Sequence, residues 1–174
     1  MIETARLRLR PWSDADRDQF FALAQDEEVM RYLPALDRAA SDNVIDRLMA
    51  AQGRDGYCFW AVERREDGAV LGFCGLMAPR PPLTEVEIGW RLARDAWGQG
   101  FASEAARASL QWAWDNIPEA MSVVAITVPE NVRSQAVMDR IGMKRDEGAD
   151  FDHPSVPEGD PLRRHVLYRI ERPA

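Results

Sequence analysis

The segment from Thr84 to Asn116 constrains the fold more than any other part of this sequence. Apolar and polar side chains alternate over residues 84–93, which is the pattern of a β-strand with two different faces. Residues 101–116 form a long helical run, in which the later apolar residues can pack on a sheet. Gly98 and Gly100 stand directly before that run. The segment therefore predicts a strand, a sharp glycine turn and a helix in direct succession.

A glycine turn directly before a helix can bind an anion. The first N–H groups of a helix have no partner inside the helix, and the helix dipole adds partial positive charge there. Glycine lets the main chain approach a phosphate without an intervening Cβ atom. Residues 98–102 are therefore predicted to bind a pyrophosphate through their main chain. A single Gly-x-Gly is also common in turns that bind nothing, so this pattern alone leaves both interpretations open.

The rest of the chain predicts one mixed α/β domain over residues 1–174, without repeats or linkers. Ser13 and Asn131 are expected to cap helices, and Gly142 is expected to end one. A further helix is expected to open at Ser41 or Asp42 and to end at Gly53 and Gly56. The expected strands are residues 5–12, 57–65, 69–78, 84–93, 121–128 and 164–171.

Composition excludes several classes of partner. The chain has 174 residues, a net charge of −7, 46% hydrophobic residues and 29% charged residues, which is ordinary for a soluble globular protein. Negative charge disfavours binding to nucleic acid. We find no apolar run long enough to span a membrane and no apolar core of a signal peptide near the start. These observations predict a cytoplasmic protein that binds neither nucleic acid nor membranes.

Cysteine and histidine are too few to predict a metal site or a disulfide framework. Cys58 and Cys74 each lie in a strand-like segment, so buried free thiols are expected, with a catalytic pair as the alternative. Only His153 and His165 could join them as nitrogen ligands, and we assign no metal. His153 and Asp152 lie in a polar loop, where surface exposure is expected and a role at an acceptor site is the alternative.

Two longer stretches carry a resemblance to a known family. VEIGWRLARDAWGQGFASEAARA (86–108) resembles the acyl-CoA-binding segment of the GNAT superfamily of N-acetyltransferases. TVPENVRSQAVMDRIGMKR (127–145) is similar to the next strand and helix of that family, and the opening and closing segments are similar too. The chain looks most like the branch that includes the ribosomal-protein N-terminal alanine acetyltransferases. A dinucleotide-binding fold is disfavoured, since its Gly-x-Gly-x-x-Gly would lie in an early βαβ unit.

The resemblance implies an α/β fold with a mixed, twisted and mostly antiparallel sheet of six to seven strands, flanked by about four helices. It implies that the strand over residues 84–93 diverges from the strand over residues 121–128. Coenzyme A would enter the V-shaped gap between them. Gly89 is expected to form a β-bulge at this divergence, since glycine inside a strand often does.

The resemblance also implies which residues contact acetyl-CoA, which is the cosubstrate. The main chain around Trp90 and Leu92 would pair with the pantetheine arm as an added strand does. Asn131 and Ser134 would face the cofactor, although both could simply form a helix cap. The residues expected to bind the cofactor are Trp90, Leu92, Arg94, Gly98, Gln99, Gly100, Phe101, Ala102, Asn131 and Ser134.

Acetyl transfer to an amine needs a proton acceptor, a donor to the oxyanion and a proton for the leaving thiolate. Glu87 is the first candidate for the base, directly or through water, and Glu85 is the second. Both could instead be solvated carboxylates, because an α-amino group with a pKa near 8 needs little help from a base. Ser134 is a candidate donor to the thiolate, and Tyr168 is a possible substitute whose place in the last strand suits packing better.

The sequence leaves the acceptor open. The resemblance implies an amine, either a protein N-terminus or a small molecule, and a homodimer is possible. Trp12, Met30, Tyr32 and Leu33 would border the acceptor pocket, but their simpler interpretation is as core residues. Two other functions stay open: a non-catalytic sensor or partner module that binds acyl-CoA, and a protein that binds a nucleotide such as ATP or NAD.

Overall fold

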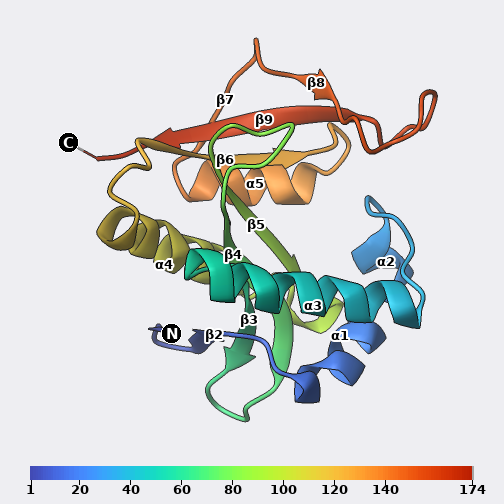
Figure 1. Cartoon of the computed structure of the whole chain (residues 1–174), viewed down its shortest axis with the longest axis vertical. Helices are drawn as coiled ribbons and strands as arrows, with labels where there is room; N and C mark the ends of the chain where they lie inside the picture. Colours follow the sequence, from blue (N-terminus) through green and yellow to red (C-terminus); the bar gives the residue numbers. More distant parts are fainter. Residues whose placement is uncertain (174) are drawn as a thin grey trace.

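The computed structural model describes residues 1–173 and has a mixed α/β architecture (Figure 1). The strands are β1 (Ile2–Glu3), β2 (Leu7–Arg10), β3 (Phe59–Arg64), β4 (Val70–Met77), β5 (Val86–Leu92), β6 (Ser122–Thr127), β7 (Lys144–Arg145), β8 (Phe151–Asp152) and β9 (Arg164–Glu171). The helices are α1 (Arg17–Leu23), α2 (Glu27–Met30), α3 (Arg38–Asp55), α4 (Phe101–Asn116) and α5 (Val132–Arg140). Short 3₁₀ turns cover Asp14–Asp16 and Arg94–Ala96.

The sheet confirms the predicted divergence of its two central strands. The strand order is β1-β2-β3-β4-β5-β6-β9-β7, with β8 paired to β9. Every pairing is antiparallel except that of β5 with β6, which is parallel. That parallel pairing joins only Val86 to Val123 and Glu87 to Val124. Beyond Glu87, β5 stays paired with β4 and leaves β6, so the sheet opens into a V at its centre.

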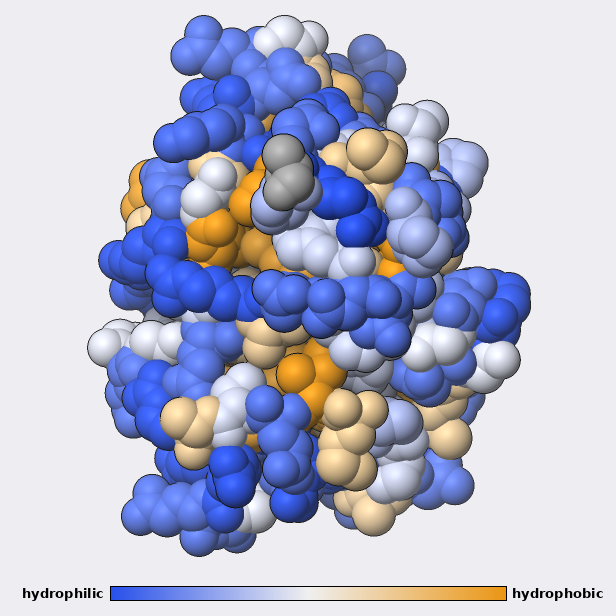
Figure 2. Space-filling model, turned by 90° about the vertical axis from the view of Figure 1, so that its left-hand side faces the viewer, coloured by the Kyte–Doolittle hydropathy of each residue, from blue (hydrophilic) through white to orange (hydrophobic). Residues whose placement is uncertain are grey.

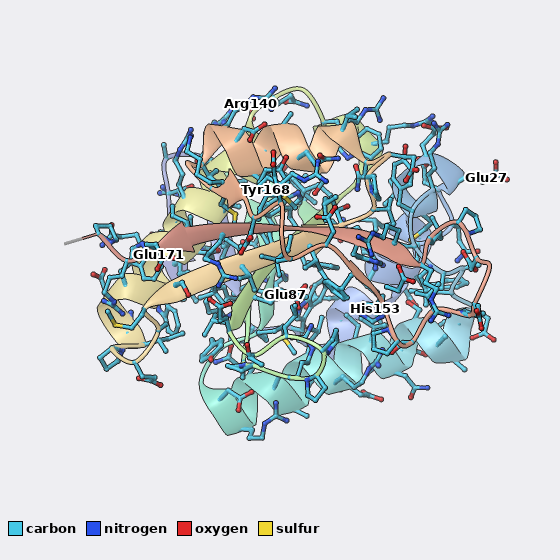
Figure 3. The ribbon with its side chains drawn as sticks, turned by 90° about the horizontal axis from the view of Figure 1, so that it is seen from above. Glu27, Glu87, Arg140, His153, Tyr168 and Glu171 are labelled. Carbon is cyan, nitrogen blue, oxygen red and sulfur yellow. The ribbon has the colours of Figure 1, made fainter. Side chains whose placement is uncertain are left out.

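Helices cover the two faces of the sheet. The α1–α3 layer lies on one face, where Phe20 of α1 approaches Phe73 of β4 with their ring centroids 6.4 Å apart. The α4–α5 layer lies on the other face, where Ser109 of α4 contacts Cys74 of β4. Seen from above, α3 and α5 lie on opposite sides of the strands (Figure 3). Because Phe73 and Cys74 are consecutive, their opposite directions follow from the alternation of side chains along a strand.

The structure has more short elements than the sequence predicts. Nine strands and five α-helices lie within residues 1–173, against the expected six to seven strands and about four helices. The additional strands β1, β7 and β8 have two residues each and exist only through pairing with β2 or β9. A two-residue segment carries no periodic pattern, which is why the sequence does not reveal these strands.

The start of α3 was also predicted wrongly. Asp37 caps this helix by accepting a hydrogen bond from the Ala40 amide, at 2.7 Å, and Ser41 is buried inside it. Gly53 lies within α3, whereas Gly56 ends it in a left-handed conformation (φ 82°), as predicted. The capping roles of Asn131 and of Gly142 (φ 90°) are confirmed.

Gly89 does not form the expected bulge. The pairing of β4 with β5 runs without a register shift from Gly72–Leu92 to Met77–Glu87, and the irregularity lies between β3 and β4 instead. A Cβ atom at Gly89 would lie 2.9 Å from the Cζ atom of Phe59. Glycine is needed here because the Phe59 ring, on the α1–α3 side, leaves no room for a side chain. It is not needed for a break in the pairing of β4 with β5.

Hydrophilic residues form most of the face that lies at the left of Figure 1, and hydrophobic ones show there in small areas between them (Figure 2). The large hydrophobic residues that are exposed, Met1, Met49, Met121 and Val132, are far apart in the sequence. Among the residues that the structure describes, no helix has the length and apolar character needed to cross a bilayer.

Candidate active site

The glycine turn has the conformation that its sequence predicts. Gly98 and Gly100 have φ angles of 72° and 81°, in the left-handed region that side chains rarely adopt. Gly100 is the N-cap of α4. An added Cβ at Gly98 would meet no atom within 4 Å, so this glycine faces open space. The turn therefore presents main chain, without side-chain bulk, at the positive end of a 16-residue helix.

The amides of this turn are free to bind a ligand. Within residues 1–173, no main-chain carbonyl accepts a hydrogen bond from the N–H groups of residues 98–103. The first such bond belongs to Glu104, which donates to the Gly100 carbonyl at 3.0 Å. Unpaired amides at a helix N-terminus bind anionic oxygen atoms well.

Arg6 holds the turn in place from behind. Its guanidinium donates to the Gln99 carbonyl at 2.9 Å, forms an ion pair with Glu104 at 2.6 Å and lies 4.4 Å from the centre of the Phe101 ring. The Gln99 side chain folds back and donates to the Asp95 carbonyl at 2.7 Å. These contacts use carbonyls and side chains of the turn, so they fix its shape and leave its amides free.

A hollow of about 530 Å³ adjoins the turn. Besides Gly100, it is lined by Arg6, Ser103, Glu104, Arg107 and Arg140. Arg107 donates to the Arg140 carbonyl at 2.6 Å and so ties α4 to the end of α5. Three arginines and one glutamate, Glu104, which pairs with Arg6, line this hollow beside the free amides. The excess of positive charge favours a ligand with more than one phosphate.

The opening between β5 and β6 runs along β5 toward the residues that lead into this turn. From Ile88 to Leu92, β5 has no strand neighbour on its β6 side, which frees main-chain groups near Trp90. The Leu92 carbonyl accepts a hydrogen bond from the Trp97 indole at 2.8 Å. Arg133, from the first turn of α5, lies 4.6 Å from the centre of the Trp97 ring and joins the two sides of the opening.

Asn131 and Ser134 lie at the start of α5, as expected. The Asn131 side chain accepts a hydrogen bond from the Ser134 amide at 3.2 Å, which makes a helix cap. Asn131 also donates to the Thr127 hydroxyl at 3.0 Å. Because Ser134 contributes its main-chain N–H to the cap, its hydroxyl group is not needed there.

Glu87 lies on the α3 side of the sheet, where β5 and β6 begin to separate (Figure 3). Its side chain is only 12% exposed and accepts a hydrogen bond from Arg80 at 2.5 Å. Burial raises the pKa of Glu87 above the ordinary glutamate value, and the Arg80 guanidinium opposes part of that shift. A buried carboxylate with a raised pKa, beside an opening, is suited to accept a proton.

Glu85 and Arg94 make other contacts. Glu85 forms an ion pair with Arg169 of β9 and accepts a hydrogen bond from Ser122. Arg94 is 63% exposed and forms an ion pair with Asp26 at 3.3 Å.

Comparison with known proteins identifies the family. The model of the acetyltransferase (GNAT) domain matches residues 6–144. The chain belongs to the GNAT acetyltransferase family. It is 34% identical over 145 residues to the uncharacterized protein YkkB of Bacillus subtilis, which covers 82% of this chain and 84% of YkkB.

Solved structures share the fold over almost the whole chain. A GNAT-family acetyltransferase from Bacillus anthracis has a TM-score of 0.81 and 25% identity, covering 98% of each chain. The ribosomal L7/L12 α-N-protein acetyltransferase RimL, in complex with coenzyme A, has a TM-score of 0.76 and 16% identity, covering 97% of this chain and 95% of RimL. The present chain is thus an acetyl-CoA-dependent N-acetyltransferase, and it transfers an acyl group to an amine.

The two histidines of the acetyltransferase lie close together, and His153 is near Arg80, which pairs with Glu87. His153 and His165 lie with ring centroids 5.1 Å apart, and Phe151 packs against both. Burial, His165 and Arg80 lower the pKa of His153. Asp152 is exposed, as expected, but it lies in β8 and not in a loop, whereas His153 is half-buried.

Other residues of the acetyltransferase are structural. Tyr168 is buried on the α5 side and donates to Gln135 at 3.3 Å, which agrees with a packing role (Figure 3). Trp12 and Met30 are buried core residues, as expected, whereas Tyr32 and Leu33 are only half-buried. Cys58 and Cys74 are buried free thiols, as expected, and burial raises the pKa of each to about 12, which disfavours the reactive thiolate. Over residues 1–173, no cluster of three or more potential ligands could hold a metal ion.

The sequence did not single out the arginines of this site. Arg6, Arg80, Arg107, Arg133 and Arg140 all contact its walls. The chain holds 22 lysines and arginines, and no spacing distinguishes these from exposed ones.

Proposed function

We propose that this acetyltransferase joins acetyl-CoA and a primary amine in a ternary complex, and that the amine attacks the thioester directly. The whole chain would act as one catalytic unit. One observation carries the proposal: the free amides of residues 98–103 adjoin an opening in the sheet beside which Glu87 lies. Candidate groups for two tasks thus lie near β5. The amides of the glycine turn would bind the diphosphate, and Glu87 would accept the proton.

Acetyl-CoA fits the groups that are present. The amides of residues 98–102 would bind the pyrophosphate, and Arg107 and Arg140 would supply positive charge for the remaining phosphate. The pantetheine arm carries amide groups, so it can pair with the exposed main chain of β5 near Trp90 and Leu92. Asn131 and Ser134 would face it from the other side of the opening.

The chemistry requires one bond to form and one to break. The amine nitrogen attacks the carbonyl carbon of the thioester, a C–N bond forms, and the C–S bond breaks. The proton lost by the amine passes to Glu87, directly or through water, and the departing thiolate gains a proton from the Ser134 hydroxyl or from solvent. A main-chain N–H near Trp90 or Leu92 would donate to the oxyanion.

Glu87 is a better candidate for the base than Glu85. Its raised pKa means that the carboxylate holds a proton more readily than an ordinary glutamate. The carboxylate of Glu85 is already engaged by Arg169 and by the Ser122 hydroxyl, on the side of β9. Glu87 therefore carries the proposal.

The acceptor is either a peptide N-terminus or a small-molecule amine. RimL acts on the ribosomal protein L7/L12, and its fold is shared, but its identity of 16% supports no transfer of that substrate. An α-amino group is the simplest acceptor for this site, because its pKa near 8 leaves an appreciable neutral fraction at pH 7.

Thiol release from acetyl-CoA tests the proposal. Amines, amino acids and short peptides with free N-termini are screened at saturating acetyl-CoA. We expect release that depends on both the amine and the enzyme, with one acetylated product for each thiol. Binding of coenzyme A without amine-dependent release would instead support the sensor, and binding of ATP or NAD in its place would contradict the proposed cosubstrate.

A further inference from the structure

Arg91 is a half-buried charged residue, and two of its three guanidinium nitrogens are buried without a polar partner. The Nε and Nη1 atoms are buried, and within residues 1–173 no hydrogen-bond acceptor contacts them. None of the ion pairs in that part of the chain includes Arg91. Burial lowers the pKa of Arg91 to about 10, and no neighbouring group opposes the shift.

Two aromatic rings hold this guanidinium in place. Its Cζ atom lies 5.2 Å from the centre of the Phe73 ring and 5.8 Å from that of Phe20. Contacts of this kind stabilise a cation, but they leave its N–H groups without acceptors. Burying an unpaired charge costs free energy, and buried charges in proteins are normally paired. An anion beside Arg91 would supply the acceptor that the described residues do not.

The position of Arg91 connects it with the proposed reaction. Arg91 and Glu87 are on the same face of β5, because side chains four residues apart in a strand point the same way. Gly89 lies midway, about 7 Å along the strand from each. The Phe59 ring covers Gly89 on that face, and the Phe59 and Phe73 rings are stacked 5.2 Å apart. An aromatic floor thus runs between the carboxylate of Glu87 and the guanidinium of Arg91.

We infer that Arg91 binds a carboxylate of the acceptor, and that the acceptor is a small molecule of the amino-acid class that carries both an amine and a carboxylate. A guanidinium binds a carboxylate through two parallel N–H groups, which suits an arginine fixed between rings. The amine would lie toward Glu87 and the carboxylate toward Arg91, with the carbon skeleton over Phe59. This inference rests on the proposed function, since it names the substrate of the same site.

Two matched sets of amines test the inference. The twenty amino acids are compared with their carboxamides, in which the negative charge is absent, by thiol release from acetyl-CoA. We expect the wild-type enzyme to prefer at least one acid over its amide by about tenfold or more in kcat/KM, as a charge-assisted pair requires. In Arg91→Met the KM for that acid rises about tenfold or more, while the values for its amide and for acetyl-CoA change less than about twofold.

Arg91→Lys and Arg54→Met are the comparison variants. Arg91→Lys keeps the charge and loses the paired N–H groups, so it is expected to recover only part of the preference. Arg54 is 65% exposed at the end of α3 and pairs with Asp55, so Arg54→Met is expected to behave as the wild type. A residue that only packed between rings would change both members of each pair equally.

A binding measurement separates failure of this inference from failure of the proposed function. The melting temperature is measured with a mixture of the twenty N-acetyl amino acids and with the matching N-acetyl amides, with coenzyme A present. We expect the acids to raise the Tm of the wild type and not that of Arg91→Met. If the acids bind in this way but no amine releases thiol, the proposed function fails and the inference stands. Amine turnover without any preference for carboxylates, or turnover of peptides that Arg91→Met leaves unchanged, would overturn the inference.

Discussion

The two sides of β5 offer different chemical groups to a ligand. On the side of the glycine turn, unpaired main-chain amides provide the proposed contacts, and Gly98 faces open space. On the side of α1 and α3, side chains provide them: Glu87, Arg80 and Arg91 from the β4–β5 region, with Phe59 and Phe73 below. The difference suggests a division of labour: main-chain groups suit a cosubstrate that is always the same molecule, acetyl-CoA. Recognition of a particular acceptor can rest on side chains, which can be exchanged without altering the fold.

Substitution at the main-chain side is expected to have the largest effect. Gly100→Glu places bulk and negative charge at a position with φ 81° in the turn that is proposed to bind the pyrophosphate, where an added Cβ would lie 3.5 Å from Nη2 of Arg6. Calorimetry should show coenzyme A binding at least about 100-fold more weakly, equivalent to about 2.7 kcal/mol.

Gly68→Glu is the matched control for that experiment. Gly68 has a similar φ of 73°, lies in the turn between β3 and β4, and faces open space. The same charge and strain there should lower stability by about 1–2 kcal/mol and leave coenzyme A affinity unchanged. Equal loss of affinity in both variants would mean that strain, and not the lost anion site, is responsible.

Substitution of Glu87 is expected to have an intermediate effect, confined to the side-chain half of the site. Glu87→Gln should lower kcat about tenfold to hundredfold and leave the Kd of coenzyme A unchanged. A base must be deprotonated to act, so the wild-type rate should fall as pH drops through the pKa of Glu87. That limb lies above the ordinary glutamate value, because burial raises this pKa.

The pH–rate profile decides whether Glu87 is the base. In Glu87→Gln the acidic limb should disappear, and the remaining dependence should follow ionisation of the amine alone. A profile that is unaltered in shape would show that Glu87 does not accept the proton.

Removal of the Ser134 hydroxyl is expected to have the smallest effect. Ser134→Ala keeps the helix cap, because the cap uses the main-chain N–H of residue 134. We expect kcat to fall about threefold if the hydroxyl protonates the thiolate, with no change in Tm. A change in Tm with constant kcat would make Ser134 a structural residue only.

The division between main chain and side chains also explains what could be predicted from the sequence. The strand over residues 84–93, the glycine turn and the cap at Asn131 are local features, each specified by residues within one turn or one strand. The divergence of β5 from β6 followed from the family resemblance, not from any local pattern. Those features together account for the cosubstrate side of the site.

The acceptor side depends on contacts between residues far apart in the chain. The alternation over residues 84–93 implies that Glu87 and Arg91 share a face, but it could not show that Phe20 covers Arg91 or that Arg80 pairs with Glu87. Arg169 lies 84 residues from Glu85, and no spacing in the sequence links them. Such partners become visible only when the fold brings them together.

The central claim is that main-chain amides of residues 98–102 hold the diphosphate of coenzyme A. Amide NMR spectra of ¹⁵N-labelled protein test it most directly, since they observe each N–H group separately as coenzyme A is added. The account predicts that the largest shifts occur at Gly98, Gly100 and their neighbours, with the Gly68 amide unmoved. Saturation with coenzyme A while the amides of residues 98–102 keep their positions would contradict it.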